Sequence, residues 1–145
     1  MTPDTLRTGG CLCGAVRFEV MVPKKRFTIC HCGMCRTWSA GPFMSVHCPG
    51  PGNFTDEKGL AWYRGSKWGE RGFCSVCGTS LFWRLAKDHE AMLGVSAEAF
   101  DDPDDLVLEQ HIYADAQPTR YEFADNTPRV TEAEFLKKYG LTLPD

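Results

Sequence analysis

Long apolar runs, an excess of basic charge and repeated segments are all missing from this sequence. No apolar run approaches the roughly 20 residues that a membrane-spanning helix requires, so no membrane partner is expected. The 16 Lys and Arg residues are outnumbered by 19 Asp and Glu residues, and the formal net charge of -3 argues against a nucleic-acid partner. With no repeat, low-complexity tract or long polar linker, the 145 residues are expected to form one domain, residues 1–145.

An export signal is also missing at the start of the sequence. Residues 1–4 carry neither the basic region nor the apolar region of a secretory signal peptide. We therefore expect a cytoplasmic protein, in a reducing compartment where cysteines serve metal binding or catalysis more often than disulfides.

Cysteine is the residue that this sequence has in unusual number. The eight cysteines stand at positions 11, 13, 30, 32, 35, 48, 74 and 77. Cysteines one or two residues apart form strained disulfides, whereas a tight turn can bring two such sulfurs onto one tetrahedral zinc ion. Three of the cysteines are followed directly by glycine, at Gly14, Gly33 and Gly78. A loop around a metal often needs a positive φ directly after the ligand, where glycine is least costly, so the pattern favours metal sites.

The hydrophobic pattern is mostly that of β-strands. In residues 15–20, the apolar side chains of Val16, Phe18 and Val20 share one face of a strand. Turn residues separate similar short runs, which span residues 26–29, 43–47, 60–64, 80–85, 91–95 and 106–113. This pattern predicts an all-β fold of antiparallel sheets.

A short C-terminal helix completes the predicted fold. Thr131 and Glu134 have capping-box spacing, residues 132–139 favour helix, and Gly140 suits its end. We expect this helix to pack on the sheets and to carry no chemistry.

The first and last cysteine pairs match each other. Cys74 and Cys77 have zinc-knuckle spacing, and Cys11 and Cys13 supply the partner pair. Four thiolates fill a tetrahedron, so we expect a closed structural zinc site whose loss would cost folding. A dithiol oxidoreductase that uses Cys74 and Cys77 is a competing interpretation, but thioredoxin-like motifs occur in βαβ surroundings, which this pattern does not show.

The middle group differs, because Cys30, Cys32 and Cys35 offer three thiolates within six residues. Three protein ligands and one open position are the arrangement of catalytic zinc. Two side chains are candidates for a fourth ligand. His31 lies inside the motif, but we expect its ring to point outward, and Cys48 is near enough in sequence to fold back. Closure by Cys48 stays open as an alternative, and it predicts a non-catalytic, zinc-stabilised protein-binding module.

The charge of a three-thiolate site narrows its chemistry. Zinc with three thiolates is negatively charged overall, which weakens it as a Lewis acid and makes ionisation of bound water harder than at a three-histidine site. A soft sulfur ligand suits the remaining position, and coordination deprotonates a thiol whose free pKa is about 8.5. A thiol substrate is therefore the natural hypothesis.

Three ordered cysteine motifs resemble one known family. Residues 9–16 read Gly-Gly-Cys-Leu-Cys-Gly-Ala-Val, residues 30–36 read Cys-His-Cys-Gly-Met-Cys-Arg, and residues 71–83 read Arg-Gly-Phe-Cys-Ser-Val-Cys-Gly-Thr-Ser-Leu-Phe-Trp. Together with residues 100–103 and 110–113, they resemble the glutathione-dependent formaldehyde-activating enzyme family, also called S-(hydroxymethyl)glutathione synthase. The resemblance covers about residues 9–125.

The resemblance implies a fold, a metal content and a reaction. The implied fold is a β-tent of folded antiparallel sheets with two zinc ions per chain. The ligands it implies are Cys11, Cys13, Cys74 and Cys77 for a structural zinc, and Cys30, Cys32 and Cys35 for a catalytic zinc. The implied activity is that of a carbon–sulfur lyase, which adds glutathione or a similar thiol to formaldehyde or a small aldehyde to form an S-hydroxymethyl adduct.

Two hypotheses describe that reaction. In the preferred one the zinc holds the substrate as a thiolate that attacks the aldehyde, and in the other the zinc polarises the carbonyl oxygen. Glutathione has two carboxylates, so cations near the site are expected to anchor it. Arg36 and Arg71 flank the cysteine motifs and are the first candidates, although each also fits a solvated surface charge.

The sequence also departs from the family pattern. Arg120 stands where relatives usually have Trp, at the expected pocket wall. The family further includes centromere protein V, whose role is not catalytic. We expect His47, His89 and His111 to be core or surface histidines rather than ligands.

Overall fold

The structure, a computed structural model, describes residues 5–140, and β-strands dominate it. Residues 1–4, on which the expectation about an export signal rests, lie outside the described residues, as do residues 141–145. The smaller sheet has three strands in the order β1-β2-β5, which are β1 (Thr5–Gly10), β2 (Arg17–Val22) and β5 (Asn53–Asp56). The predicted all-β fold is confirmed.

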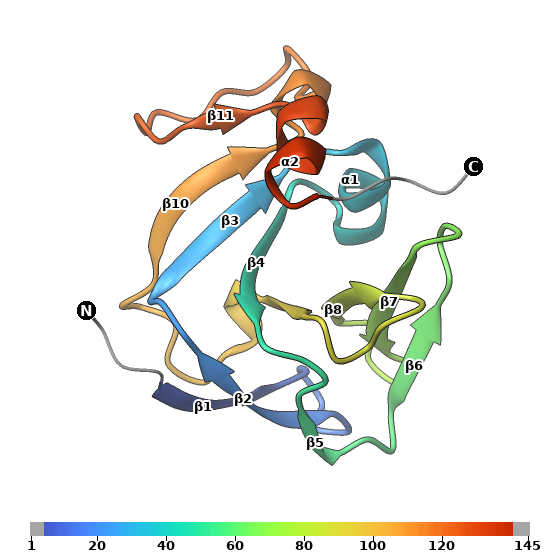
Figure 1. Cartoon of the computed structure of the whole chain (residues 1–145). Helices are drawn as coiled ribbons and strands as arrows, with labels where there is room; N and C mark the ends of the chain where they lie inside the picture. The colour runs from blue at the N-terminus through green and yellow to red at the C-terminus, as the bar shows by residue number, and fades with distance from the viewer. Residues whose placement is uncertain (1–4, 141–145) are drawn as a thin grey trace.

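The larger sheet has eight strands in the order β11-β10-β3-β4-β9-β8-β7-β6. Its strands are β3 (Arg26–Cys30), β4 (Phe43–Cys48), β6 (Leu60–Tyr63), β7 (Gly69–Cys74), β8 (Ser80–Leu85), β9 (Leu93–Ser96), β10 (Val107–Ile112) and β11 (Arg129–Val130). Figure 1 shows this sheet bent, so that β10 and β3 stand on one side of the molecule and β6 and β7 on the other, above the three-stranded sheet. Among residues 5–140, no helix has both the length and the apolar character needed to cross a membrane.

The main core lies between the two sheets. Phe18, Val20 and Val22 alternate along β2, and each is at most 3% exposed. The Phe18 ring packs edge-on against Phe82 and Phe100, with ring centroids 5.3 and 5.5 Å away. Burying one such side chain stabilises the fold by about 1.5–3 kcal/mol. The alternation predicted from the sequence therefore positions the small sheet on the large one.

Two helices lie beside the middle cysteine motif. Helix α1 (Gly33–Ser39) follows β3 directly, and it was not expected from the sequence. Its N-cap is Cys32, whose sulfur accepts a hydrogen bond from the Cys35 backbone N–H at 3.3 Å. Cysteine and glycine are not typical helix-starting residues, so the sequence carries no ordinary start signal.

The predicted C-terminal helix is present as α2 (Glu132–Lys138). The Glu134 backbone N–H donates to the Thr131 hydroxyl at 3.2 Å, and the Thr131 backbone N–H donates to the Glu134 carboxylate at 3.1 Å. The predicted capping box is therefore confirmed. Phe135 of this helix packs toward the smaller core that contains Cys30 and Cys35.

Most strand pairs are antiparallel as expected, but β10 pairs in parallel with both β3 and β11. Ile112 of β10 lies beside Cys30 of β3, so this pairing brings the end of β10 to the middle cysteine motif. The strands β1, β5 and β7 were also missed, because they are rich in glycine or polar residues and show little hydrophobic alternation.

Candidate metal centres

Four cysteine thiols from two loops meet at one end of the sheets. Cys11 and Cys13 lie between β1 and β2, Cys74 ends β7, and Cys77 precedes β8. The four sulfurs all lie within 4.8 Å of one another, and the Cys11–Cys13 and Cys13–Cys74 sulfurs are 3.7 Å apart. Sulfurs at the corners of a zinc tetrahedron with Zn–S bonds of about 2.3 Å are about 3.8 Å apart. This group can therefore hold a tetrahedral metal ion with four sulfur ligands.

Backbone N–H groups of the two loops stabilise negative charge on these sulfurs. The backbone N–H groups of Val76 and Cys77 both donate to the Cys74 sulfur at 3.4 Å. In the other loop, the backbone N–H of Val16 donates to the Cys11 sulfur at 3.3 Å. Hydrogen bonds to the charged form of a thiol favour that form, and a thiolate is the form that binds a metal.

The residues that follow these cysteines complete the turns. Gly14 and Gly78 have φ values of 83° and 81°, as predicted for glycines after a ligand. Gly33 does not have a positive φ and begins helix α1 instead, so the prediction is wrong there. The Thr79 hydroxyl lies 3.1 Å from the Cys77 sulfur, and this hydrogen bond is the main cause that lowers the pKa of Cys77 to about 5.

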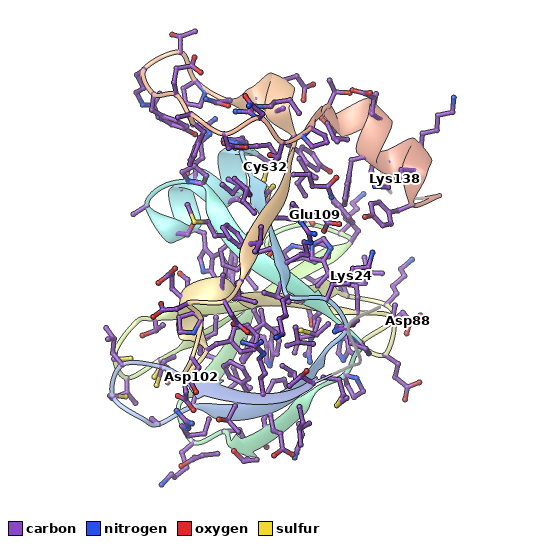
Figure 2. The ribbon with its side chains drawn as sticks, turned by 90° about the vertical axis from the view of Figure 1, so that its left-hand side faces the viewer. Lys24, Cys32, Asp88, Asp102, Glu109 and Lys138 are labelled. Atoms are coloured by element: carbon purple, nitrogen blue, oxygen red, sulfur yellow. The ribbon has the colours of Figure 1, made fainter. Side chains whose placement is uncertain are left out.

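The second group consists of three thiols. Cys30 ends β3, Cys32 caps α1, and Cys35 lies in its first turn, and their sulfurs lie within 4.8 Å of one another. Cys30 is 9% exposed and Cys35 5%, whereas Cys32 is half-buried. Within residues 5–140, no other Cys, His, Asp or Glu side chain joins this group. In Figure 2, Cys32 lies in the upper half of the molecule, away from Asp102 beside the three-stranded sheet.

Cys48 does not close this second group. It is 2% exposed in the core between the sheets, where its sulfur donates to the Val46 carbonyl at 3.7 Å. Burial raises the pKa of Cys48 to about 12, so it stays a neutral thiol. The structure therefore contradicts the alternative in which Cys48 is the fourth ligand.

A buried cation lies against the three-thiol group. Arg71 is 5% exposed, its Nη1 donates to the Cys35 sulfur at 3.5 Å, and its guanidinium lies 5.2 Å from the centre of the Trp38 ring. Within the described residues, Arg71 forms no ion pair with a carboxylate. An unpaired buried charge is strongly destabilising, so the thiolates are its counter-charge. Hydrogen bonds from Cys30 and Cys35, with Arg71 as a smaller cause, lower the pKa of Cys32.

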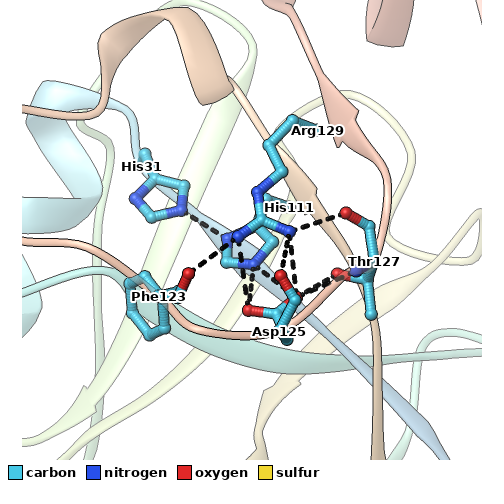
Figure 3. A network of polar contacts seen from close by, with 6 residues as sticks. All are labelled: His31, His111, Phe123, Asp125, Thr127 and Arg129. Atoms are coloured by element: carbon cyan, nitrogen blue, oxygen red, sulfur yellow. Dashed lines mark hydrogen bonds and ion pairs between the residues drawn. The ribbon is translucent and has the colours of Figure 1, made fainter.

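Behind the cysteines, the ring of His31 enters a buried polar network (Figure 3). His31 and His111 are both 0% exposed, and the His31 Nε2 lies 2.7 Å from the His111 Nδ1. The other nitrogen of His111 lies 3.1 Å from both oxygens of Asp125, which also accepts hydrogen bonds from Thr127 and Arg129. The His31 ring therefore points away from the three-thiol group, as expected, but it is buried in the protein.

The hydrogen-bond network determines which ring nitrogens of His31 and His111 carry a proton. An ionised Asp125 can only accept, so His111 Nε2 carries a proton and its Nδ1 accepts from His31 Nε2. His31 Nδ1 is then free to accept from the Tyr121 hydroxyl, 3.3 Å away. Burial, with the nearby positive groups, lowers the pKa of His31 to about 4, so it is neutral at pH 7. A chain of hydrogen bonds thus fixes the backbone between Cys30 and Cys32.

The remaining predicted site residue, Arg36, lies on α1. Its Nε donates to the His31 carbonyl at 2.9 Å, and the residue is half-buried. Near the end of the same helix there is an open cavity of about 440 Å³, a volume that suits a small-molecule ligand. Its wall includes Trp38, Ser39, Phe43, Ser80, Ser96 and Glu98. Trp38 and Phe43 also pack against the three-thiol group, so the cavity adjoins it.

Sequence reasoning grouped the cysteines as the structure does but missed their supports. His111, Asp125 and Thr79 are separated from their cysteines or lack any motif of their own, and no spacing rule points to them. Arg71 was named because it flanks the motif of Cys74, but as a partner of a substrate carboxylate and not as a contact of Cys35.

An all-β fold with two groups of converging thiols places the protein among cysteine-rich domains that can hold metal ions. The model of one family, "Glutathione-dependent formaldehyde-activating enzyme", matches residues 6–116. That match covers most of the chain, and the protein therefore belongs to the glutathione-dependent formaldehyde-activating enzyme family.

Individual relatives agree with this assignment. An "Uncharacterized lyase" of Schizosaccharomyces pombe is 28% identical over 129 residues, which are 89% of this chain and 93% of the relative. A Halomonas elongata protein named "Putative glutathione-dependent formaldehyde-activating enzyme" is 33% identical over 86 residues, 53% of this chain and 55% of the relative. The crystal structure of a Rhodobacter sphaeroides protein has the same fold, with a TM-score of 0.58 and 19% identity over 85% of this chain and 99% of the other.

Proposed function

We propose that this protein is a zinc-dependent carbon–sulfur lyase that adds glutathione or a similar thiol to formaldehyde or another small aldehyde, as an S-(hydroxymethyl)glutathione synthase does. The observation that carries the proposal is the inequality of the two thiol groups. One group has four sulfurs, and the other has three with no further donor among residues 5–140. The family and the names of the relatives support the reaction class. That residues 1–145 form a single domain stays a prediction.

The proposal gives each thiol group a metal ion and a task. A structural zinc ion would be held by Cys11, Cys13, Cys74 and Cys77, and a catalytic zinc ion by Cys30, Cys32 and Cys35. When bound, the catalytic zinc supplies a position that keeps a substrate thiol in its thiolate form, because three sulfur ligands favour another soft ligand. The sulfur–sulfur distances of 3.7 Å support zinc in the four-cysteine group, and the convergence of three sulfurs within 4.8 Å supports a metal ion in the other.

The protein's own residues hold this reactive region in place. Arg71 offsets the negative charge of the thiolates from the buried side. Trp38 and Phe43 pack with ring centroids 5.1 Å apart and exclude water from the sulfurs of Cys30 and Cys35. The excluded water makes each remaining electrostatic contact stronger. Two small reactants held in such a place gain rate mainly from orientation.

The cavity beside α1 is the proposed place for the rest of the thiol substrate. A volume of about 440 Å³ accepts a molecule of tripeptide size in part, and the serine hydroxyls on its wall offer polar contacts. Arg36, which is not fully buried, is the proposed partner of a substrate carboxylate. For Arg71 a carboxylate contact stays a prediction, and its Nη1 is already engaged with Cys35.

Exchange NMR on the zinc-loaded protein tests the proposal. We expect the protein to accelerate exchange between glutathione and its S-hydroxymethyl adduct in the presence of formaldehyde. Cys32→Ser should remove the acceleration while the fold remains. Cys48→Ser is the matched control, because Cys48 is buried outside both thiol groups, and it should keep the acceleration.

Two results would contradict the proposal. One is an unchanged exchange rate when the wild-type protein is given glutathione, cysteine or 2-mercaptoethanol in turn. The other is X-ray absorption that reports four protein sulfurs on both ions in the absence of an added thiol.

A further inference from the structure

Tyr113, the first residue after β10, has an unusual backbone conformation. Among residues 5–140, only Ala40 and Tyr113 have a positive φ without being glycine. Ala40 caps the end of helix α1, where the left-handed conformation is common. Tyr113, at φ 53° and ψ 39°, precedes a single 3-10 turn and has no such explanation. A strained residue of this kind persists where the surrounding structure holds it, and such residues cluster at functional sites.

The side chain of Tyr113 is also unusual. Its hydroxyl oxygen is buried and has no hydrogen-bond partner among the described residues. Buried hydroxyl groups in native proteins are nearly always paired, so an unpaired one requires an explanation. A tyrosine without a partner gains nothing from its hydroxyl in the folded state, and phenylalanine would pack equally well there.

The position of Tyr113 supplies that explanation. Its ring packs against the core that contains Cys30 and Cys35, and its ring centroid lies 5.7 Å from that of Phe135. The unpaired hydroxyl of Tyr113 is therefore a hydrogen-bond donor on a residue that packs beside Cys30 and Cys35.

We propose that Tyr113 is a catalytic residue whose hydroxyl donates a hydrogen bond to the aldehyde oxygen while the thiol sulfur bonds to the aldehyde carbon. This inference rests on the proposed function and adds a specific donor to it. The donor reaches the reaction from the end of β10, which the parallel pairing places beside Cys30.

The step balances without a further reactant. The substrate thiol loses its proton to solvent, and a sulfur–carbon bond forms. The electron pair of the carbonyl π bond moves to the oxygen, which then takes a proton from water. Nothing is oxidised or reduced. Negative charge builds on the oxygen during bond formation, and a buried donor aimed at that oxygen stabilises the charge with little rearrangement.

Tyr113→Phe removes only the hydroxyl and tests the inference. Tyr139→Phe is the matched control, because Tyr139 lies at the end of α2 and packs on Phe135 from outside the cysteine core. The first measurement is thermal unfolding, in which Tyr113→Phe should unfold at the wild-type temperature or above it. The second is exchange NMR, in which Tyr113→Phe should slow adduct formation about 100-fold, as expected for loss of one such donor, while Tyr139→Phe keeps the wild-type rate.

A binding measurement provides a readout besides activity. Zinc-loaded protein is titrated by calorimetry with glutathione alone and with glutathione pre-equilibrated with formaldehyde. Tyr113→Phe should weaken binding of the adduct mixture about tenfold and leave the affinity for glutathione within about twofold. Only the adduct carries the hydroxymethyl oxygen, which derives from the aldehyde.

The inference is overturned if Tyr113→Phe lowers the unfolding temperature, since the hydroxyl then has a partner within the protein. It is also overturned if the rate and the ratio of the two affinities match the wild type. In that case a wild-type protein that accelerates exchange still supports the proposed function. If the wild-type protein neither accelerates exchange nor binds glutathione, the proposed function fails first and Tyr113 loses its role with it.

Discussion

The two cysteine groups of this protein are held by different kinds of contact. In the four-cysteine group, the sulfurs accept hydrogen bonds from backbone N–H groups two to five residues away, such as Val16 to Cys11 and Val76 to Cys74. In the three-cysteine group, the Cys32 sulfur accepts one such hydrogen bond from the Cys35 N–H, and side chains from distant parts of the sequence provide further support. Arg71 contacts Cys35, and Asp125 fixes His31 through His111.

The four-cysteine group is therefore supported by its own loops, whereas the three-cysteine group also depends on side chains from elsewhere in the sequence. Backbone hydrogen bonds within a tight turn depend on the local fold and tie the four-cysteine loops to it. Side chains that reach a loop from elsewhere can tune its charge and position without changing the sheet. Supports of this second kind commonly surround reactive metal ligands, whose orientation and basicity they set.

The largest expected effect is at the four-cysteine group. Cys74→Ser should lower the free energy of unfolding by about 4 kcal/mol or more, because the group joins two loops 61 residues apart and the proposed zinc ion there would contribute to folding. Cys32→Ser should cost about 1 kcal/mol or less. Urea unfolding of the zinc-loaded proteins measures both. Equal losses from the two variants would mean that the groups do not differ in kind.

Asp125→Asn should act on the three-cysteine group alone. An asparagine pairs less well with His111, so we expect a loss of about 2 kcal/mol in the free energy of unfolding and a metal affinity about tenfold lower at that group. Competition with a chelator measures the affinity. Asp56→Asn is the control, because Asp56 accepts only from the Lys58 backbone N–H and pairs with its ammonium. A similar loss of metal from the four-cysteine group would contradict the proposed difference in support between the two groups.

The glycines after the cysteines offer a finer comparison. Gly78→Ala should destabilise the protein by about 1 kcal/mol, because its φ of 81° is strained for alanine although no atom lies within 4 Å of the added carbon. Gly33→Ala should be neutral or stabilising by up to about 1 kcal/mol, since Gly33 is helical and the added carbon meets only Arg36 Nη2 at 3.7 Å. Thermal unfolding of both variants is the measurement, and a reversed order would contradict the assignment of the two turns.

The smallest expected effect concerns Asp101, which attaches the hairpin that carries Cys11 and Cys13. Its carboxylate accepts from Arg17 at 2.6 Å and from Thr8 at 2.7 Å, and these hydrogen bonds lower its pKa to about 2, below the ordinary 3.8. The stabilisation is therefore fully present above about pH 4 and is lost as the pH falls toward 2. Because the pair is partly exposed, Asp101→Asn should cost only about 0.5 kcal/mol.

Urea unfolding of wild type and Asp101→Asn should give the same difference at about pH 6 and about pH 8. The difference should shrink in about 1 M salt, which screens exposed ion pairs. A difference that changes across that pH range would assign the effect to another titrating group.

Much of the fold could be predicted where one face of a strand is buried. The run from Val16 to Val22 shows a period of two because its alternate side chains enter the core. Helix α1 could not be predicted, since its cap is the sulfur of Cys32 and its first residue is a glycine. The parallel pairing of β10 with β3 could not be predicted either, because no local pattern distinguishes a parallel partner from an antiparallel one.

The candidate site could likewise be predicted only in part. Metal-ligand spacing is a local property, so the two cysteine groups could be recognised in the sequence. Burial of Arg71, the contact between His31 and His111, and the left-handed conformation of Tyr113 all depend on segments brought together by the sheet. Cys48 shows the reverse case, in which sequence proximity suggested a ligand and the direction of β4 placed it in another core.

The late position of β10 in the chain has a consequence for how the protein is made. A growing polypeptide contains every member of the four-cysteine group once residue 77 has been synthesised, whereas His111 and Asp125 follow more than thirty residues later. Domains are completed only when their last interacting segments are available. The four-cysteine group can thus assemble on a nascent chain before the three-cysteine group receives its contacts with His111 and Asp125.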